Sequence, residues 1–559
     1  MPFQTTWRML APFCFAAVVL VSSGICANTC DDLAALALPG AKITSVHLFP
    51  AGSSFTAPPD GFAQVKTYDN LPAFCRVSAT LAPAPDSNIW VEAWLPATSW
   101  NQKFLGTGNG GYAGSIVYPG MADALKRGYA VANTDMGTAP ALWWNAAALA
   151  GHPEKWRDFG HRATHLMTQT AKRLINAYYG SPPARSYFRG CSTGGQQGLM
   201  EAQRYPEDYD GIIAGAPGNN RTHLLASFVW VYGSTQPAMG RLSSTKLGLL
   251  HQKVLEACVI SGGGAPPDKF LNDPRDCHFD PHSLQCAGAD APTCLTGAEV
   301  VGATRIYDGP RNPGNGHLVY PGLPRGSEVD WLILEPPFSI PGLPAPFGQP
   351  AFDGMFRWVF GPNWNWQTFD FNEHMAKVDD ALASTLNAND PDLRPYEKRG
   401  GKLIIYHGQA DPLVAPQNTI NYYNRVVAAQ KAAGNLTTAQ AFNATRQFAR
   451  LFLAPGMTHC LGGPGPNVFN GADNLDGPQD SQHDVLTALD HWVMQGTAPD
   501  MIIATRFPDP TNALMTRPMC AYPYRALYVS GDANVAASFK CVVHRDFTNP
   551  TPPAAEYER

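Results

Sequence analysis

Short apolar runs recur along the chain and predict buried strands. Residues 89–96 alternate between apolar and polar positions, which is typical of a strand with one face on a core. Residues 129–135 and 209–217 are more continuously apolar, as strands of a parallel sheet are. Further strands are predicted directly before Gly190, over residues 401–408 and over residues 448–453.

Helical patterns fall between these runs. Residues 161–179 carry apolar side chains at helical spacing, among them Leu166, Ala171 and Leu174, and residues 196–204 read as a second helix. Alternation of strand and helix predicts a parallel sheet in an α/β core. The alternation stops between residues 219 and 392, where cysteines, prolines and tryptophans accumulate. We therefore predict a core of residues 28–218 and 393–559, interrupted by a lid domain of residues 219–392.

A candidate nucleophile lies where a predicted strand meets a predicted helix. The sequence there is Gly190-Cys191-Ser192-Thr193-Gly194, which has the Gly-x-Ser-x-Gly spacing of a nucleophile elbow. In that device the serine sits on a strained turn, and its neighbours must be small so that backbone can pass close by. A glycine- and serine-rich loop without chemistry is the alternative.

Candidate partners of Ser192 follow in the order Ser, Asp, His that this kind of elbow favours. Asp411 comes directly after the strand of residues 401–408, and His459 lies on the loop after the strand of residues 448–453. An Asp-Pro turn is usually structural, which is the alternative for Asp411. The glycine-rich loop 106–111 follows another predicted strand, where a second oxyanion donor would belong; a dinucleotide-binding loop or a plain turn are the alternatives.

Composition excludes several classes of protein. The chain has 559 residues, 45% apolar and 15% charged, and a net charge of −5, so it has no basic footprint for nucleic acid. Residues 1–27 read as a secretory signal peptide, and no later stretch is long and apolar enough for a membrane span. We therefore expect a secreted or periplasmic protein that has no membrane contact after signal removal.

Cysteine usage agrees with export. Ten cysteines remain after residue 27, and an even number in an exported chain suggests disulfides. No C-x-x-C pair occurs, which argues against zinc. Proximity in sequence suggests the pairs Cys258–Cys277, Cys286–Cys294 and Cys520–Cys541, and leaves Cys30, Cys75, Cys191 and Cys460.

Three motifs together resemble the tannase and feruloyl esterase family, which also contains bacterial mono(2-hydroxyethyl) terephthalate hydrolase. They are Gly190-Cys191-Ser192-Thr193-Gly194-Gly195, His407-Gly408-x-x-Asp411-Pro412 and Pro455-Gly456-Met457-x-His459-Cys460. The resemblance covers nearly the whole chain after residue 27. It implies an α/β-hydrolase core with a lid, Ser192 as nucleophile, His459 as general base and acid, and Asp411 as its orienting group.

The resemblance implies further site features. The backbone N–H groups of Gly111 and Thr193 would bind the oxyanion. A Cys191–Cys460 disulfide would tie the serine turn to the histidine loop, with a chain-entropy contribution of about 4–5 kcal/mol as an upper figure. Cys30–Cys75 is then the remaining pair.

The family's lid usually carries an aspartate-rich calcium loop after a cysteine. Here the stretch after Cys258 keeps only Asp268 as a plausible remnant, with Asp273 nearby. Calcium prefers 6–8 oxygen ligands, several of them from carboxylates. We therefore expect that the protein requires no cofactor. Calcium could bind only through a ligand set that has lost most of its usual carboxylates.

The resemblance implies a small-molecule ester as substrate. We expect a serine carboxylesterase for esters of aromatic acids, feruloyl or galloyl, with terephthalate monoesters as the second candidate. A non-catalytic binding protein on a hydrolase scaffold and a peptidase are the alternatives from other classes. His407, at the end of a strand, is expected to border the aromatic acid, and Trp364 or Trp366 to cover its ring; the alternative for His407 is a structural role.

Overall fold

The computed structural model describes residue 1 and residues 29–58, 65–334, 349–472, 475–507 and 514–544. Its centre is a nine-stranded sheet with the strand order β1-β4-β5-β7-β6-β8-β9-β10-β11. The remaining described strands form three two-stranded sheets, β2-β3, β12-β13 and β14-β15. The strands are β1 Ala41–Phe49, β2 Ser53–Thr56, β3 Thr67–Leu71, β4 Phe74–Leu81, β5 Ile89–Pro96, β6 Lys103–Thr107, β7 Ala130–Thr134, β8 Arg185–Cys191, β9 Gly211–Gly215, β10 Lys402–Gly408, β11 Ala449–Ala454, β12 Met501–Arg506, β13 Met515–Cys520, β14 Tyr524–Tyr528 and β15 Phe539–Val543.

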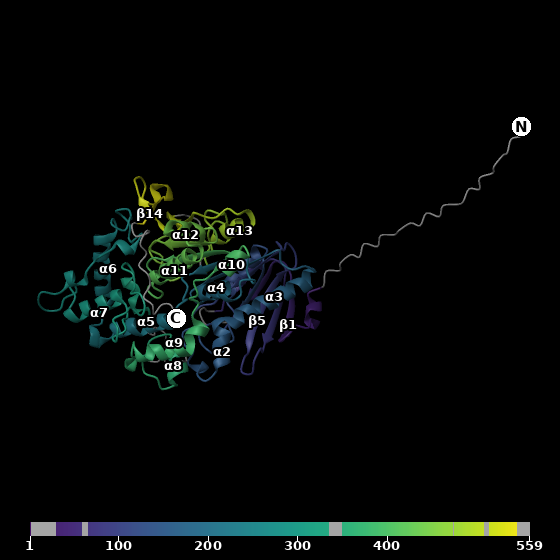
Figure 1. Ribbon diagram of the computed structural model, residues 1–559, viewed down its shortest axis with the longest axis horizontal. Helices are drawn as coiled ribbons and strands as arrows, with labels where there is room; N and C mark the ends of the chain where they lie inside the picture. The colour runs from purple at the N-terminus through teal and green to yellow at the C-terminus, as the bar shows by residue number, and fades with distance from the viewer. Residues whose placement is uncertain (2–28, 59–64, 335–348, 473–474, 508–513, 545–559) are drawn as a thin grey trace.

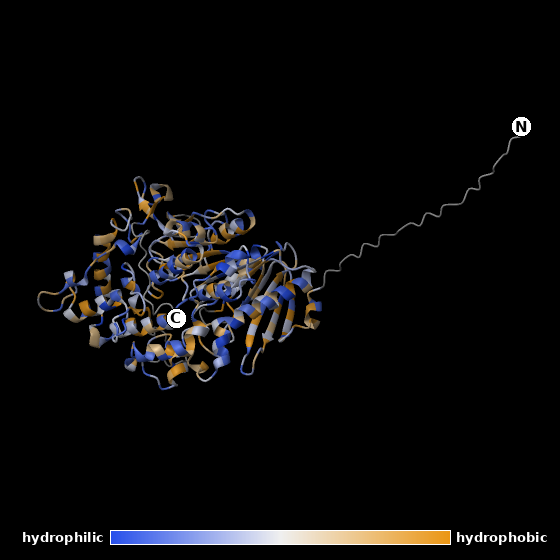
Figure 2. Cartoon of the chain, in the orientation of Figure 1, coloured by the Kyte–Doolittle hydropathy of each residue, from blue (hydrophilic) through white to orange (hydrophobic). Residues whose placement is uncertain are grey.

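The predicted α/β class is confirmed, but the sheet is mixed rather than wholly parallel. From β7 to β11 every neighbouring pair runs parallel, whereas β1, β4, β5 and β7 pair antiparallel. β1 and β4 precede the first strand that the sequence predicted. The residues of β1 are half-buried or exposed, those of β4 are buried or half-buried, and Figure 2 shows hydrophilic and hydrophobic residues mixed along the strands at this edge. An antiparallel edge can face water on one side, so its strands carry a weaker apolar signal.

Helices cover both faces of the sheet (Figure 1). Two apolar clusters separate the faces, because successive residues of a strand point in opposite directions. Leu403 packs in the cluster that holds α3, α4 and α11, while Ile404 packs in the one that holds α1 and α13. The helices are α1 Tyr118–Lys126, α2 Pro153–Arg157, α3 Ala163–Tyr179, α4 Thr193–Arg204, α5 Arg221–Ser234, α6 Ser244–Cys258, α7 Gly297–Asp308, α8 Gly354–Phe360, α9 Glu373–Leu386, α10 Arg394–Lys398, α11 Pro416–Gly434, α12 Thr438–Thr445 and α13 Val485–Gln495.

The segment predicted as a lid lies between β9 and β10 in the chain. Its described residues, 219–334 and 349–392, hold α5 to α9 and contribute no strand to the nine-stranded sheet. In Figure 1 these helices form the teal and green mass beside the core. Arg221, the first residue of α5, hydrogen-bonds to Gly111 and Thr193, which follow the carboxyl ends of β6 and β8. The segment is therefore placed where it can cover the edge at which α/β sheets bind ligands.

Five disulfides are formed among the described residues, and they are the five pairs expected from the sequence: Cys30–Cys75, Cys191–Cys460, Cys258–Cys277, Cys286–Cys294 and Cys520–Cys541. Within the described ranges, the helices are all too short or too polar to span a bilayer. The predicted signal peptide, residues 1–27, lies outside the described residues apart from residue 1.

Candidate active site

Ser192 occupies the turn between β8 and α4 in a strained backbone conformation. Its φ is 62° and its ψ −117°, a region that residues other than glycine rarely adopt. The turn closes because glycines flank it: a Cβ on Gly190 would lie 2.7 Å from the backbone of Gly194, and one on Gly195 would lie 2.2 Å from the Gly215 carbonyl oxygen. The sequence of small residues thus produces the elbow geometry that the spacing predicted.

Asp411 and His459 are brought together by neighbouring parallel strands. Asp411 follows β10 and His459 follows β11, and these two strands pair in parallel. His459 Nδ1 lies 2.7 Å from Asp411 Oδ2, so Asp411 accepts the Nδ1 proton and leaves Nε2 of the ring as an acceptor. The Leu413 and Val414 N–H groups donate to the other carboxylate oxygen at 2.8 and 3.0 Å.

Asp411 is completely buried, which by itself disfavours its charged form. The His459 and His407 side chains, through charge and hydrogen bonds, outweigh this burial and hold the pKa of Asp411 well below its ordinary value. The carboxylate is therefore ionised throughout the neutral range and can orient His459.

His407 is not among the residues that line the cavity next to Ser192, described below, which corrects the expectation from the sequence. It is fully buried, and its Nε2 lies 3.1 Å from Asp411 Oδ2 and 2.8 Å from the Val414 carbonyl oxygen. Its Nδ1 lies 2.8 Å from the Thr419 hydroxyl. These contacts fit the alternative stated for His407 in the sequence analysis, a structural role.

The glycine-rich loop after β6 approaches the amino end of α4. The Gly111 carbonyl oxygen accepts from the Thr193 hydroxyl at 2.6 Å and from Arg221 Nη2 at 2.8 Å. Gly111 has a φ of +54°, and a Cβ there would lie 1.9 Å from the Trp143 carbonyl oxygen, so only glycine fits. Thr193 is the first residue of α4, where helical N–H groups have no partner within the helix. Gly111 and Thr193 therefore lie side by side at the serine turn.

Arg221 joins these parts, and the sequence analysis missed it. The residue is the first of α5 and is 3% exposed. Besides Gly111, it donates to the Thr193 hydroxyl at 2.9 Å, and its guanidinium lies over the rings of Tyr112 and Phe159. Burial lowers its pKa to about 10, so it remains a cation at neutral pH. The sequence could have pointed to Arg221, because an arginine shortly after β9 lies at the carboxyl edge of the sheet, where ligands bind.

A cavity of about 380 Å³ opens beside the serine turn. Ser192, His459, Gly111 and Arg221 all line it, and the rest of the wall is mainly apolar. The apolar wall comes from the loop before α2, the start of α5, the loop before α8 and the loops that carry the aspartate and histidine: Trp143, Leu224, Leu225, Phe228, Phe352, Leu413, Val414 and Leu461. This combination of apolar walls and a few convergent polar groups is typical of a small-molecule site.

Trp364 and Trp366 do not line this cavity, which corrects the second expectation about substrate contacts. Trp364 is buried against Phe356, and Trp366 packs edge-on against Tyr232. Trp364 belongs to the apolar core, and the half-buried Trp366 packs against that core. Trp143 is the tryptophan that reaches the cavity; it lies outside the segment predicted as the lid, and nothing local in its sequence marked it.

The expected remnant of a calcium loop is occupied by positive side chains. Arg517 donates to Asp268 Oδ1 at 2.5 Å, and the Ala265 N–H donates to the other oxygen at 2.8 Å. Asp273 forms a bidentate pair with Arg275. Since a guanidinium neutralises each carboxylate, these residues do not fit a calcium ligand set.

Known proteins share this architecture. The family model described as tannase and feruloyl esterase matches residues 75–542. An uncharacterized esterase of Xanthomonas campestris pv. campestris is 37% identical over 96% of this chain and 95% of that protein. A probable feruloyl esterase B-2 of Aspergillus flavus is 34% identical over 82% of this chain and 85% of that protein. The crystal structure of feruloyl esterase B from Aspergillus oryzae matches with a TM-score of 0.82 and 28% identity, over 92% of this chain and 99% of that one.

Proposed function

Since the chain belongs to the tannase and feruloyl esterase family and is an esterase, we propose that it hydrolyses esters of aromatic acids, feruloyl or galloyl, through a serine acyl-enzyme. The observation that carries this proposal is the strained Ser192 on the wall of an apolar cavity that also receives the ring of His459. A cavity of about 380 Å³ is at the small end of the range for ligand pockets, which suits a single aromatic ring.

In the proposed mechanism the Ser192 hydroxyl attacks the ester carbonyl while His459 Nε2 takes its proton. The Asp411 carboxylate holds the opposite ring nitrogen and stabilises the imidazolium that forms. The N–H groups of Gly111 and Thr193 stabilise the oxyanion of the tetrahedral intermediate. His459 then protonates the leaving alcohol, and a water molecule, activated by the same ring, releases the acid.

Terephthalate monoesters remain the second candidate substrate because the cavity also holds a cation. This cation is the guanidinium of Arg221, which lines the cavity. A terephthalate monoester carries a free carboxylate that a cation would recognise. Feruloyl and galloyl groups present phenolic hydroxyls, which can also accept hydrogen bonds from a guanidinium.

We propose that the reaction needs no cofactor and takes place outside the cytoplasm. The mechanism above is complete with groups of this chain. Five disulfides among the described residues support an oxidising compartment, secreted or periplasmic.

Hydrolysis of a substrate panel tests the proposal. The panel contains methyl hydroxycinnamates, methyl gallate, a terephthalate monoester, a short aliphatic ester and the amide of the best acid. We expect kcat/KM to be highest for one of the aromatic esters and the amide to be inert. The variant Ser192→Ala should lose at least 10³-fold in kcat, while Ser181→Ala, at an exposed serine, should match the parent. A folded Ser192→Ala protein with the parent's rate would refute the mechanism, and a preference for the aliphatic ester would refute the substrate class.

A further inference from the structure

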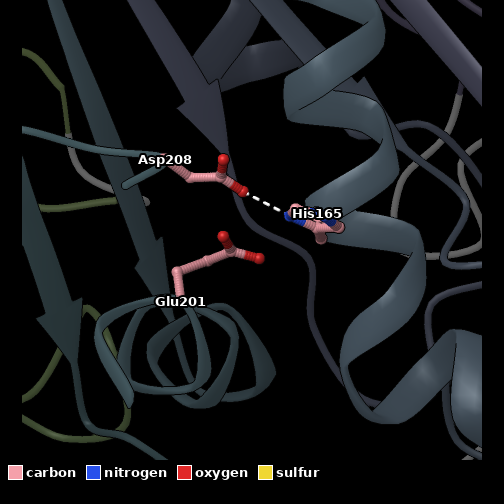
Figure 3. Close-up of side chains that lie close together, drawn as sticks. All are labelled: His165, Glu201 and Asp208. Carbon is pink, nitrogen blue, oxygen red and sulfur yellow. Dashed lines mark hydrogen bonds and ion pairs between the residues drawn. The ribbon is translucent and has the colours of Figure 1, made fainter. Parts of the chain in front are cut away.

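A second cluster of ionisable side chains lies away from the cavity, at the far end of the nucleophile helix. His165 comes from α3, Glu201 from the last turns of α4, and Asp208 from the loop that leads into β9 (Figure 3). One ligand atom of each residue lies within 4.8 Å of the other two. The three side chains thus converge on one point from three separate segments.

Glu201 is the unusual member of this cluster. The residue is 1% exposed, and no donor among the described residues reaches its carboxylate oxygens, whose hydrogen-bonding neighbour is the Asp208 carboxylate. Figure 3 shows its carboxylate directed toward Asp208 and His165. Burial and the Asp208 carboxylate raise the pKa of Glu201 well above its ordinary value. An isolated buried carboxylate is costly, so this group requires a proton or a cation.

His165 is already held in position. Its Nδ1 lies 2.6 Å from Asp208 Oδ2, and its ring stacks on Tyr205 with the centroids 3.9 Å apart. Its Nε2 lies 2.9 Å from the side-chain amide of Gln169, whose oxygen can accept the Nε2 proton once the amide is turned. Such a partner behind the ring fixes the tautomer of a metal-binding histidine.

One lysine lies next to the cluster, and one edge of the cluster is open to solvent. Lys172 lies beside it, donates to the Asp208 carbonyl oxygen, and has its pKa lowered by burial. The edge of the cluster is open to solvent, since the His165 side chain is 21% and the Asp208 side chain 10% exposed. A cation can therefore reach the cluster from solvent, and water can complete its coordination.

From this geometry we propose that His165, Glu201 and Asp208 bind one divalent transition-metal ion, of which Zn²⁺ is the probe. One imidazole nitrogen and two carboxylates form a mixed nitrogen and oxygen donor set, which suits such ions better than Ca²⁺ or Mg²⁺. On binding, the Glu201 carboxyl releases its proton to solvent, and the ring proton of His165 moves from Nδ1 to Nε2, where it faces Gln169. The ion replaces the His165–Asp208 hydrogen bond.

The role that follows is structural. Glu201 lies nine residues after Ser192 along the same helix, so the site is about 13 Å from the serine at 1.5 Å per residue. The ion would join α3, the end of α4 and the segment entering β9. It would thereby fix the helix whose amino end carries the serine turn, without touching the substrate.

Calorimetric titration of the metal-free full chain with Zn²⁺ tests the site. The chain is first treated with EDTA and dialysed. We expect one equivalent to bind and the Tm to rise by several degrees, because a ligand that binds only the folded state stabilises it. In Glu201→Gln this binding should weaken at least 100-fold, and Glu207→Gln, which alters an adjacent exposed carboxylate, should bind like the parent.

His165→Gln, at a partly exposed position, repeats the test if Glu201→Gln fails to fold. Absence of stoichiometric binding to the parent would overturn the proposal and leave Glu201 as a protonated carboxyl. Equal Zn²⁺ binding by the parent and by both variants would also overturn it, since the ion would then lie elsewhere. Because neither readout uses an ester, the result is independent of the proposed esterase substrate.

Discussion

One oxygen of Asp411 is shared by two histidines, but only His459 reaches the cavity. The second, His407, is closed in by Thr419, the Val414 carbonyl and Asp411 itself. Its Nε2 faces two acceptors, Asp411 Oδ2 and the Val414 carbonyl oxygen, and must therefore carry the ring proton. His407 thus donates a hydrogen bond to the carboxylate, and because it is fully buried it does not contact the cavity. His407 is thus a positioning residue for Asp411.

Replacing His407 by Leu should lower kcat about 10- to 100-fold with little change in KM. The reason is the loss of a hydrogen bond to a charged group, worth about 1.5–3 kcal/mol. His407→Gln, which keeps an N–H donor, should recover part of the rate. Steady-state kinetics on an aromatic and an aliphatic ester provide the measurement. A rise in KM for the aromatic ester alone would instead show that His407 contacts the substrate, and would contradict the positioning role.

Asp135, just after β7, provides a test of pH dependence. It is fully buried, and although the Trp90 and Gly137 N–H groups donate to one of its oxygens, burial raises its pKa to about 6. Between pH 4 and 6 the folded state therefore holds a proton that the unfolded state releases. The contribution of Asp135 to the free energy of unfolding therefore falls as the pH rises through this window, by about 3 kcal/mol.

Asp135→Asn should remove this dependence. Relative to the parent, the variant should gain stability as the pH rises from 4 to 6 and show a constant difference above 6. Urea unfolding at several pH values gives the comparison, with Asp31→Asn, at an exposed position, as the control. A difference that stays flat across the window would show that Asp135 is ionised in the folded state at all these pH values.

At the scale of elements, the predictable features were those coded by neighbouring residues. β5 was predicted with its observed bounds, Ile89–Pro96, because apolar and polar residues alternate along it. The turn at Ser192 was predictable because its glycines are adjacent in sequence. β1 and β4 were missed, since an edge pair with one wet face has no continuous apolar run. The cavity wall was also missed, because Trp143, Phe228 and Phe352 meet only in the folded chain.

The Cys191–Cys460 disulfide joins two of these elements, the serine turn and the histidine loop. Its residues are 269 positions apart, so its removal frees a long loop and should cost up to about 5 kcal/mol. Replacement of both cysteines by serine should lower Tm and also lower kcat, because the two active-site loops lose their link. The corresponding change at Cys286–Cys294, 8 residues apart, should cost about half as much stability and leave kcat unchanged. Equal kinetic effects of both changes would contradict the positioning role.

At the scale of the whole molecule, the inserted segment is attached to the far end of the chain by a buried ion pair. Arg517 on β13 and Asp268 after α6 are both almost completely buried, with their side chains 0% and 1% exposed. The Arg517 guanidinium also lies over Phe539, with the charge 3.9 Å from the ring centroid. This pair occupies the region where the family resemblance implied calcium, so a cation of the chain neutralises Asp268.

Arg517→Met should therefore destabilise the fold by about 3–5 kcal/mol, because it leaves the Asp268 charge buried and unpaired. Adding Asp268→Leu to it should restore part of the loss. Arg394→Met, at an exposed pair with Asp392, should cost less than about 1 kcal/mol.

Calcium should not stabilise the unaltered chain. After treatment with EGTA, the Tm measured with added Ca²⁺ should equal the Tm measured without it, because the Asp268 and Asp273 carboxylates are already paired with arginines. A Tm that rises specifically with Ca²⁺ would show that other oxygens complete a calcium site here and that the ion pair does not replace it.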